Sequence, residues 1–240
     1  MPLFFVETNL SSNQIVELNA AQSHHVLKVL RHRRGDLLDV VGATPQIYQA
    51  RLLADKKKAQ LQILQPCPRS LMNIHPITVA TSILPTNTLK WLVEKLTELG
   101  CENLYLMNLK FSGMAWKKTE AERKINQLKK SCEETLKQCE RFKSLNIHFS
   151  SSLETCVNLS LPYNRLFLWE SSKPDTSFPE LNLKNPTWVF IGPPGGWHEQ
   201  EVALLQKQGF PSHWAGPGLM RVETAALYAM SLLKLKYEQH

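Results

Sequence analysis

Alternation between short apolar strands and amphipathic helices constrains the fold of this chain more than any other feature of its sequence. Thr187–Ile191 is nearly all apolar, as buried strands of a parallel sheet tend to be. Leu89–Leu99 carries its leucines on one helical face, and we expect Asn87 to cap the start of this helix and Gly100 to end it. This alternation predicts an α/β fold around a largely parallel sheet. The other predicted elements are strands 77–84 and 103–107, helix 119–142, strands 147–149 and 165–169, helix 199–208, strand 212–215 and helix 222–237.

The N-terminal part of the chain has a different pattern. Residues 37–64 contain three strand-like runs separated by turn-forming residues, and residues 22–31 are the helical exception. We therefore expect a small N-terminal β-barrel. Pro66–Ser70 interrupts regular structure, so we predict two domains, 1–68 and 74–240.

Two loops rich in glycine and proline follow predicted strands. They are Gly192-Pro193-Pro194-Gly195-Gly196 and Gly216-Pro217-Gly218. Ligands bind at the carboxyl ends of strands in open α/β sheets, and glycine allows the backbone to approach a ligand closely. The loops match neither a P-loop nor G-x-G-x-x-G and carry little positive charge. They favour an adenine-containing ligand held by backbone atoms, with two structural turns as the alternative.

Three polar residues crowd the start of the last predicted helix: Arg221, Glu223 and Thr224. An acid in the first turn suits the helix dipole, whereas an arginine does not. We therefore expect Arg221 to serve a site rather than the helix. The alternative is a surface ion pair between Arg221 and Glu223.

The net charge of +7 is concentrated in the first two thirds of the chain. His24–Gly35 contains four lysines and arginines, three histidines and no acid. Such basic clusters neutralise phosphates, so we expect contact with RNA or DNA there. Lys117–Lys143 is also basic but contains many glutamates. A solvated helix face is an equal alternative for that segment.

Other features exclude several protein classes. The five cysteines form no C-x-x-C pair, which favours reduced thiols and no metal site. No apolar run approaches the ~20 residues that span a bilayer, so we expect no membrane partner. Met1–Glu7 lacks the basic start of a signal peptide. We therefore expect a cytoplasmic protein.

Five motifs follow one another along nearly the whole chain. They are His24–Arg31 with Arg34-Gly35-Asp36, then Glu94–Gly100, then Glu134 with Gln138 and Arg141, then Ile191–Gly196 with Glu201, and finally Arg221–Ala225. In this order they resemble the bacterial 16S ribosomal RNA uracil-N3 methyltransferases of the SPOUT superfamily.

The resemblance implies a PUA-like RNA-binding β-barrel followed by a SPOUT α/β domain tied in a deep trefoil knot. It also implies a homodimer that binds S-adenosyl-L-methionine and acts on 16S ribosomal RNA or the small ribosomal subunit. The cofactor-binding residues it implies are Thr81, Leu84, Trp169, Glu170, Ile191, Gly192, Pro193, Gly195, Gly196, Ala215, Gly216, Leu219, Met220 and Ala225. The RNA-binding residues it implies are His25, Lys28, Arg31, Arg33, Arg34, Gln138 and Arg141.

The chain departs from the family pattern at four places. Pro194 replaces an acid, Gly218 replaces an arginine, and Lys110–Gly113 replaces a Glu-Arg-Ser motif. His198 replaces a serine that caps a helix, and we expect a poorer cap there with Glu201 supplying half of a capping box. These departures indicate a divergent member.

Methylation of uracil N3 requires removal of its proton and stabilisation of the resulting charge. We assign charge stabilisation at a uracil carbonyl oxygen to Arg221, and positioning of Arg221 or the base to Glu223 and Thr224. No residue is marked as the general base, and Glu98 is only a distant candidate. Two alternatives remain: a relative with a different RNA target, and an RNA-binding protein that has lost methyl transfer.

Overall fold

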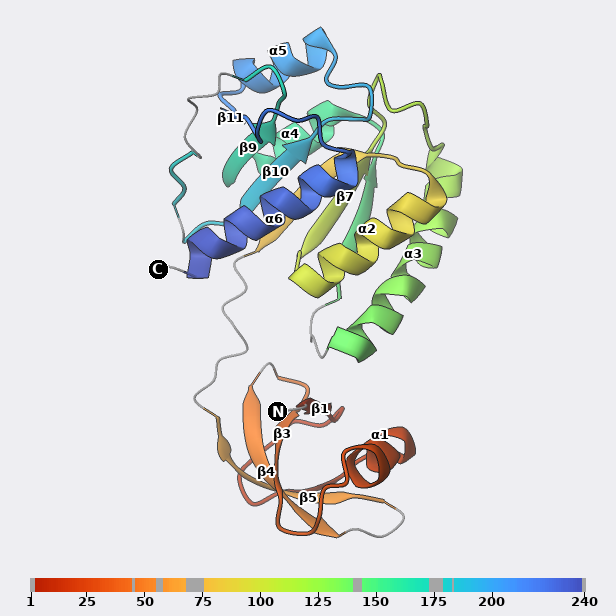
Figure 1. Ribbon diagram of the computed structural model, residues 1–240, viewed down its shortest axis with the longest axis vertical. Helices are drawn as coiled ribbons and strands as arrows, with labels where there is room; N and C mark the ends of the chain where they lie inside the picture. Colours follow the sequence, from red (N-terminus) through yellow and green to blue (C-terminus); the bar gives the residue numbers. More distant parts are fainter. Residues whose placement is uncertain are drawn as a thin grey trace. The chain divides into compact units, whose positions relative to one another are not determined.

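The computed structural model describes residues 3–44, 46–54, 58–67, 76–139, 144–172, 179–182 and 184–238. The chain divides into two compact units, Met1–Ile74 and His75–His240 (Figure 1). The segment in which we placed the domain boundary lies mostly outside the described residues. The functions assigned to the two predicted domains stay predictions.

The first unit is a curled five-stranded sheet with strand order β1-β3-β4-β5-β2. Its elements are β1 (Leu3–Phe5), β2 (Ile15–Glu17), α1 (Ala20–His24), a π-helical turn (His25–Val29), β3 (Leu37–Val41), β4 (Ile47–Ala54) and β5 (Gln60–Pro66). Leu38, Leu52 and Leu61 are fully buried in its core. The unit is the small β-rich domain that the sequence predicts. Strands β1 and β2 lie at the two edges of this sheet, and the described strand pairs do not join them to each other. The sheet is therefore an open barrel and not a closed one.

The second unit contains a six-stranded sheet, and every adjacent pair of strands in it is parallel. Its strands are β6 (Ile77–Ser82), β7 (Asn103–Met107), β8 (Asn146–Ser150), β9 (Asn164–Leu168), β10 (Thr187–Ile191) and β11 (Ser212–His213), in the order β11-β9-β10-β6-β7-β8. Its helices are α2 (Thr86–Leu99), α3 (Lys118–Cys139), α4 (Leu153–Ser160), α5 (Glu199–Lys207) and α6 (Val222–Glu238). The predicted parallel α/β fold is confirmed.

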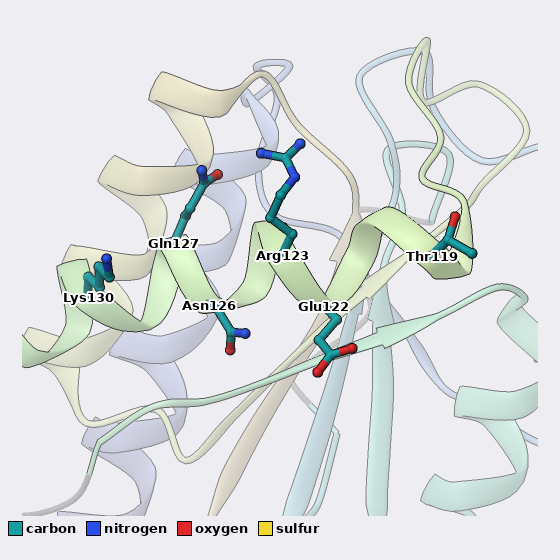
Figure 2. A pocket seen from close by; sticks show the side chains of 6 residues that line it. All are labelled: Thr119, Glu122, Arg123, Asn126, Gln127 and Lys130. Atoms are coloured by element: carbon teal, nitrogen blue, oxygen red, sulfur yellow. The ribbon is translucent and has the colours of Figure 1, made fainter.

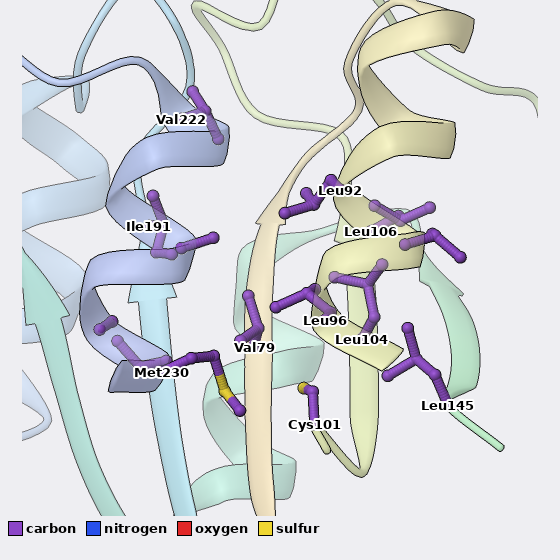
Figure 3. Close-up of a cluster of buried hydrophobic side chains, with 14 of the residues drawn as sticks. Val79, Leu92, Leu96, Cys101, Leu104, Leu106, Leu145, Ile191, Val222 and Met230 are labelled. Atoms are coloured by element: carbon purple, nitrogen blue, oxygen red, sulfur yellow. The ribbon is translucent and has the colours of Figure 1, made fainter. Parts of the chain in front are cut away.

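Two hydrophobic layers cover the two faces of this sheet. Side chains alternate along β6, so that Val79 belongs to one layer and Ala80 to the other. Figure 3 shows Val79 near Leu96 of α2 and Met230 of α6. Helices α2, α3 and α6 therefore cover one face, and α4 and α5 cover the other. The deep trefoil knot concerns how the chain threads through its loops, and it stays a prediction.

The structure corrects several predicted boundaries. Helix α4 is missing from the predicted elements, although Ser152 caps it by accepting a hydrogen bond from the Thr155 amide. Helix α2 begins at Thr86 after Pro85, so Asn87 is not its cap. Gly100 ends α2 as predicted, with a φ of 76°. Its left-handed conformation favours glycine.

Three of the described cysteines are buried, and burial makes their thiols unreactive. Burial raises the pKa of the Cys101 thiol to about 12 and that of Cys156 to about 11. Since the thiolate is the reactive form, we expect iodoacetamide at neutral pH to modify half-buried Cys67 long before Cys101 or Cys156. Mass spectrometry of the native protein checks this. Equal labelling of Cys67 and Cys101 without denaturant would contradict it.

Candidate functional site

A cavity of about 680 Å³ lies at the carboxyl ends of β9, β10 and β11. Parallel strands end at the same edge of a sheet, so the loops after these three strands meet there with the start of α6. The sequence-predicted residues that line the cavity are Leu84, Trp169, Glu170, Ile191, Gly192, Pro193, Gly195, Gly196, Ala215, Gly216, Leu219, Met220, Arg221, Glu223 and Ala225.

Two of the residues predicted to be catalytic or cofactor-binding do not line this cavity. Thr81 is fully buried in β6, and Thr224 is exposed on α6. The cavity wall also contains Pro85, Thr88 and Trp214, which we did not predict. Pro85 and Thr88 follow the carboxyl end of β6. The rule that ligands bind at the carboxyl ends of strands could therefore have predicted them.

The loop after β10 packs so tightly that its glycines have little room for a side chain. A Cβ atom at Gly192 would lie 3.0 Å from the indole nitrogen of Trp197, and that N–H donates to the Leu168 carbonyl at 2.8 Å. A Cβ at Gly195 would lie 2.8 Å from the Cβ of Phe111. Gly196 has a φ of 79°, a conformation that favours glycine. The loop is therefore held in one shape against its neighbours.

The loop after β11 has open space around its glycines, unlike the tightly packed loop after β10. Gly216 has a φ of 116°, and a Cβ atom there or at Gly218 would meet nothing within 4 Å. Leu219 is 89% exposed and Met220 is 38% exposed. The backbone of this loop therefore borders free space at the cavity.

The segment after β7 is fastened to the start of α5. Glu201 accepts the Lys110 amide at 3.0 Å and the His198 amide at 3.0 Å through its two carboxylate oxygens. His198 in turn accepts the Gln200 amide at 3.1 Å. The expected half of a capping box, in which the Glu201 side chain accepts the His198 amide, is present, and the His198 imidazole also caps the first turn of α5. That His198 is a poorer cap than serine stays a prediction.

Arg221 stands exposed immediately before α6, at the rim of the cavity. Its carbonyl accepts the Ala225 amide at 2.9 Å, which ties the residue to the first turn of α6. Glu223 is half-buried and lines the same cavity. Among the described residues Arg221 and Glu223 form no ion pair. The surface ion pair that was the alternative to a role at the site is therefore not formed.

Comparison with known proteins identifies the family. A family model for RNA methyltransferase domains matches residues 72–234. The chain belongs to this RNA methyltransferase family. The resemblance drawn from the motifs is thus confirmed at this level.

Individual relatives match nearly the whole chain. A ribosomal RNA small subunit methyltransferase E from Mesomycoplasma hyopneumoniae is 26% identical over 237 residues, covering 95% of this chain and 92% of the relative. A crystal structure of a ribosomal RNA small subunit methyltransferase E from Neisseria gonorrhoeae, bound to S-adenosyl methionine, has a TM-score of 0.72 at 23% identity, covering 99% of this chain and 98% of that one. Another structure with bound SAM, from Legionella pneumophila, has a TM-score of 0.67 at 22% identity, covering 98% and 97%. These structures share the fold of this chain.

The RNA-binding residues predicted in the first unit lie on its surface. His25, Lys28, Arg31, Arg33 and Arg34 are all exposed. They follow one another along the π-helical turn and the loop before β3. The side chain of Gln138 and all of Arg141, the other two predicted RNA-binding residues, lie outside the described residues.

Asp36 shapes the basic loop of the first unit. Its carboxylate accepts the Arg33 amide at 2.9 Å and lies 3.1 Å from the His32 imidazole. These hydrogen bonds hold the pKa of the Asp36 carboxyl below its ordinary value, the Arg33 amide contributing most. Arg31 adopts a left-handed φ of 58° in the same loop. The backbone of this loop therefore has a defined shape around its exposed arginines.

Replacing Asp36 with alanine removes the acceptor that closes this loop. We expect RNA affinity to fall about threefold to tenfold, as for loss of one or two exposed hydrogen bonds. Asp36→Asn keeps an acceptor oxygen and serves as the matched control. Fluorescence anisotropy with a labelled ribosomal RNA fragment measures both. If Asp36→Ala bound as tightly as the wild-type protein, the loop shape would have no part in RNA binding.

The described residues lack two other features. No helix in them is long and apolar enough to cross a membrane. They also contain no group of three histidine, cysteine, aspartate or glutamate side chains arranged to hold a metal ion.

Proposed function

We propose that this chain transfers a methyl group from S-adenosyl-L-methionine to N3 of a uridine in 16S ribosomal RNA of the small ribosomal subunit. The observation that carries the proposal is the cavity formed by the three loops at the carboxyl ends of β9, β10 and β11. The names of the relatives support small-subunit ribosomal RNA as the substrate, and the molecule bound in two structures of the same fold supports the cofactor.

The residues present fit this cofactor. The cavity volume of about 680 Å³ is within the usual range for small-molecule sites. Open space beside Gly216 leaves its backbone free to contact a flat ring. Glu170 and Glu223 supply negative charge to a cationic ligand, and Arg221 supplies positive charge to a carboxylate or an oxyanion. When bound, S-adenosyl-L-methionine supplies an activated methyl group on a sulfonium.

The chain's own residues then position and activate the uridine. Arg221 extends from the rim and stabilises negative charge on a uracil carbonyl oxygen while the N3 proton leaves. Glu223 lines the cavity and orients Arg221 or the base, and Thr224 supports the same turn from outside. The target base must leave its stack to enter the cavity.

The rest of the assembly follows from the same proposal. The first unit anchors the RNA through the basic loop held by Asp36. Two copies of the chain form a homodimer, the second unit is knotted, and the protein works in the cytoplasm where ribosomal RNA is made.

Two measurements test the proposal. Calorimetry on the purified protein is expected to give saturable binding of S-adenosyl-L-methionine with about one site per chain. Nucleoside mass spectrometry of small-subunit RNA incubated with protein and cofactor is expected to detect new N3-methyluridine. Methylation of a different nucleoside would place the target elsewhere. No cofactor binding at millimolar concentration would leave an RNA-binding protein without methyl transfer, with Pro194 and Gly218 as the first positions to examine.

A further inference from the structure

A second concave surface lies next to the cavity, between α2 and α3. It has a volume of about 580 Å³. Its lining residues are Thr86, Leu89, Lys90, Trp116, Arg123, Lys124, Gln127, Leu128, Lys130, Ser131 and Glu134. We call this surface the α2–α3 groove. Its lining contains four lysines and arginines and one acid, so it is strongly positive.

Helical spacing places two of the basic residues of α3 on one face of the helix, together with Gln127. Arg123, Gln127 and Lys130 line the α2–α3 groove at positions i, i+4 and i+7, one face of a helix. Figure 2 shows the side chains of Arg123 and Gln127 pointing one way from α3 and those of Glu122 and Asn126 pointing the other way, although all four line one pocket on this helix. Glu122 therefore lies on the same face of α3 as Arg123 and Lys130, and Glu134 is the acid in the lining of the groove.

Three of the four cations that line the α2–α3 groove form no ion pair among the described residues. Lys124 pairs with Glu120 at 2.7 Å and lies 5.0 Å above the ring of Trp116. In the part of the chain that the structure describes, Lys90, Arg123 and Lys130 form no ion pair. Glu134 lies in the lining, and Glu120 is close enough to Arg123 to interact with it electrostatically. The four cations of the groove outnumber these two acids, and this excess favours an anionic partner.

The floor of the groove is rigid. Trp116 is only 6% exposed. Asn108 holds its backbone on both sides, accepting the Trp116 amide at 3.0 Å and donating to the Trp116 carbonyl at 3.0 Å. Trp116 also packs against Phe149, with ring centres 6.1 Å apart. The hydrogen bonds and the ring contact therefore fix the surface over which Lys124 lies.

The start of α2 separates the groove from the cavity. Pro85 and Thr88 face the cavity, whereas Thr86 and Lys90 face the groove. The groove and the cavity therefore lie within one turn of α2 of each other, so the RNA next to a nucleotide in the cavity is within reach of the groove. The eight residues from Arg123 to Lys130 span about 10 Å of helix, enough to meet two or three successive phosphates.

We propose that the α2–α3 groove binds the phosphate backbone of the substrate RNA beside the nucleotide that enters the cavity. The inference rests on the proposed function, because RNA is the polyanion that function requires. Lys90, Arg123 and Lys130 contact phosphates. Glu134, at the far end of the groove, accepts a hydrogen bond from a ribose hydroxyl.

The double variant Arg123→Gln/Lys130→Gln tests the groove. The probe is small-subunit ribosomal RNA transcribed in vitro, and affinity is measured by filter binding over a series of salt concentrations. We expect weaker binding and a salt slope smaller by about 1.4, since each lost phosphate contact removes ~0.7. The affinity for S-adenosyl-L-methionine and the melting temperature should not change, because both side chains are exposed.

Lys118→Gln/Lys129→Gln is the matched control, since it removes two exposed cations of the same helix that lie outside the groove. Wild-type affinity and slope in Arg123→Gln/Lys130→Gln would overturn the inference. Equal weakening by the control variant would also overturn it, because the loss of affinity would then reflect only the lower net charge of the protein. Binding is measured without methyl transfer, so a wild-type protein that binds the RNA in this way but transfers no methyl group would refute the proposed activity and leave the groove supported.

Discussion

Arg221→Ala is expected to slow single-turnover methyl transfer about a hundredfold to a thousandfold, the usual cost of removing one group that stabilises developing charge. The affinity for S-adenosyl-L-methionine should change little, because Arg221 is exposed at the rim rather than packed in the cavity wall. The rate is measured with saturating RNA and cofactor, so that weaker binding does not enter the result. Calorimetry measures cofactor affinity separately.

Two further variants make this prediction specific. Arg221→Lys keeps the charge but loses the planar guanidinium, and we expect an intermediate rate. Lys207→Ala removes an exposed cation at the end of α5, away from the cavity, and should leave the rate unchanged. A full single-turnover rate in Arg221→Ala would assign the charge stabilisation to another residue.

The strands of the second unit are predictable because burial on both faces marks them in the sequence. The predicted bounds of β7 and β10 match the structure, and every residue of β10 is buried. The core helices α2 and α6 are predictable for the same reason, since each carries a continuous apolar face. The spacing of apolar residues in the sequence therefore predicts which surfaces of these elements pack in the core.

Features set by local geometry or by distant contacts were missed. Helix α4 has only eight residues, too few for a clear helical period, and its cap at Ser152 is the better signal. The start of α2 is fixed by Pro85 rather than by a side-chain cap at Asn87. The contact between Lys110 and Glu201 joins residues 91 positions apart. Neither residue type nor spacing marks such a pair.

The cavity was predictable to the extent that strand ends define it. The rule that ligands bind at carboxyl ends of parallel strands brings the loops after β10 and β11 together without any structure. Thr81 shows the limit of the rule, because it lies in β6 near the same edge but is fully buried beneath the cavity wall. A position at the end of a strand predicts only that a residue lies near the cavity. The direction of its side chain decides whether the residue lines the cavity.

Gly195→Ala is expected to lower cofactor affinity more than tenfold by separating two loops. The new Cβ would lie 2.8 Å from the Cβ of Phe111 and 3.1 Å from its carbonyl oxygen, and neither atom is the end of a flexible side chain. The Gly195 amide donates to that carbonyl at 3.3 Å, so relief of the clash also weakens this hydrogen bond. Overpacking of this kind costs about 1–3 kcal/mol. Calorimetry and thermal unfolding measure the two effects.

The cause of the Gly195 effect is tested with Gly218→Ala and with a second change at Phe111. A Cβ at Gly218 meets nothing within 4 Å, so Gly218→Ala should leave the melting temperature unchanged. Phe111→Gly removes the Cβ that Gly195→Ala meets, and the double variant should recover part of the lost affinity. Recovery would show that the loop after β10 binds ligand only while the segment after β7 holds it. If Gly195→Ala alone bound S-adenosyl-L-methionine normally, that contact would have no part in shaping the cavity.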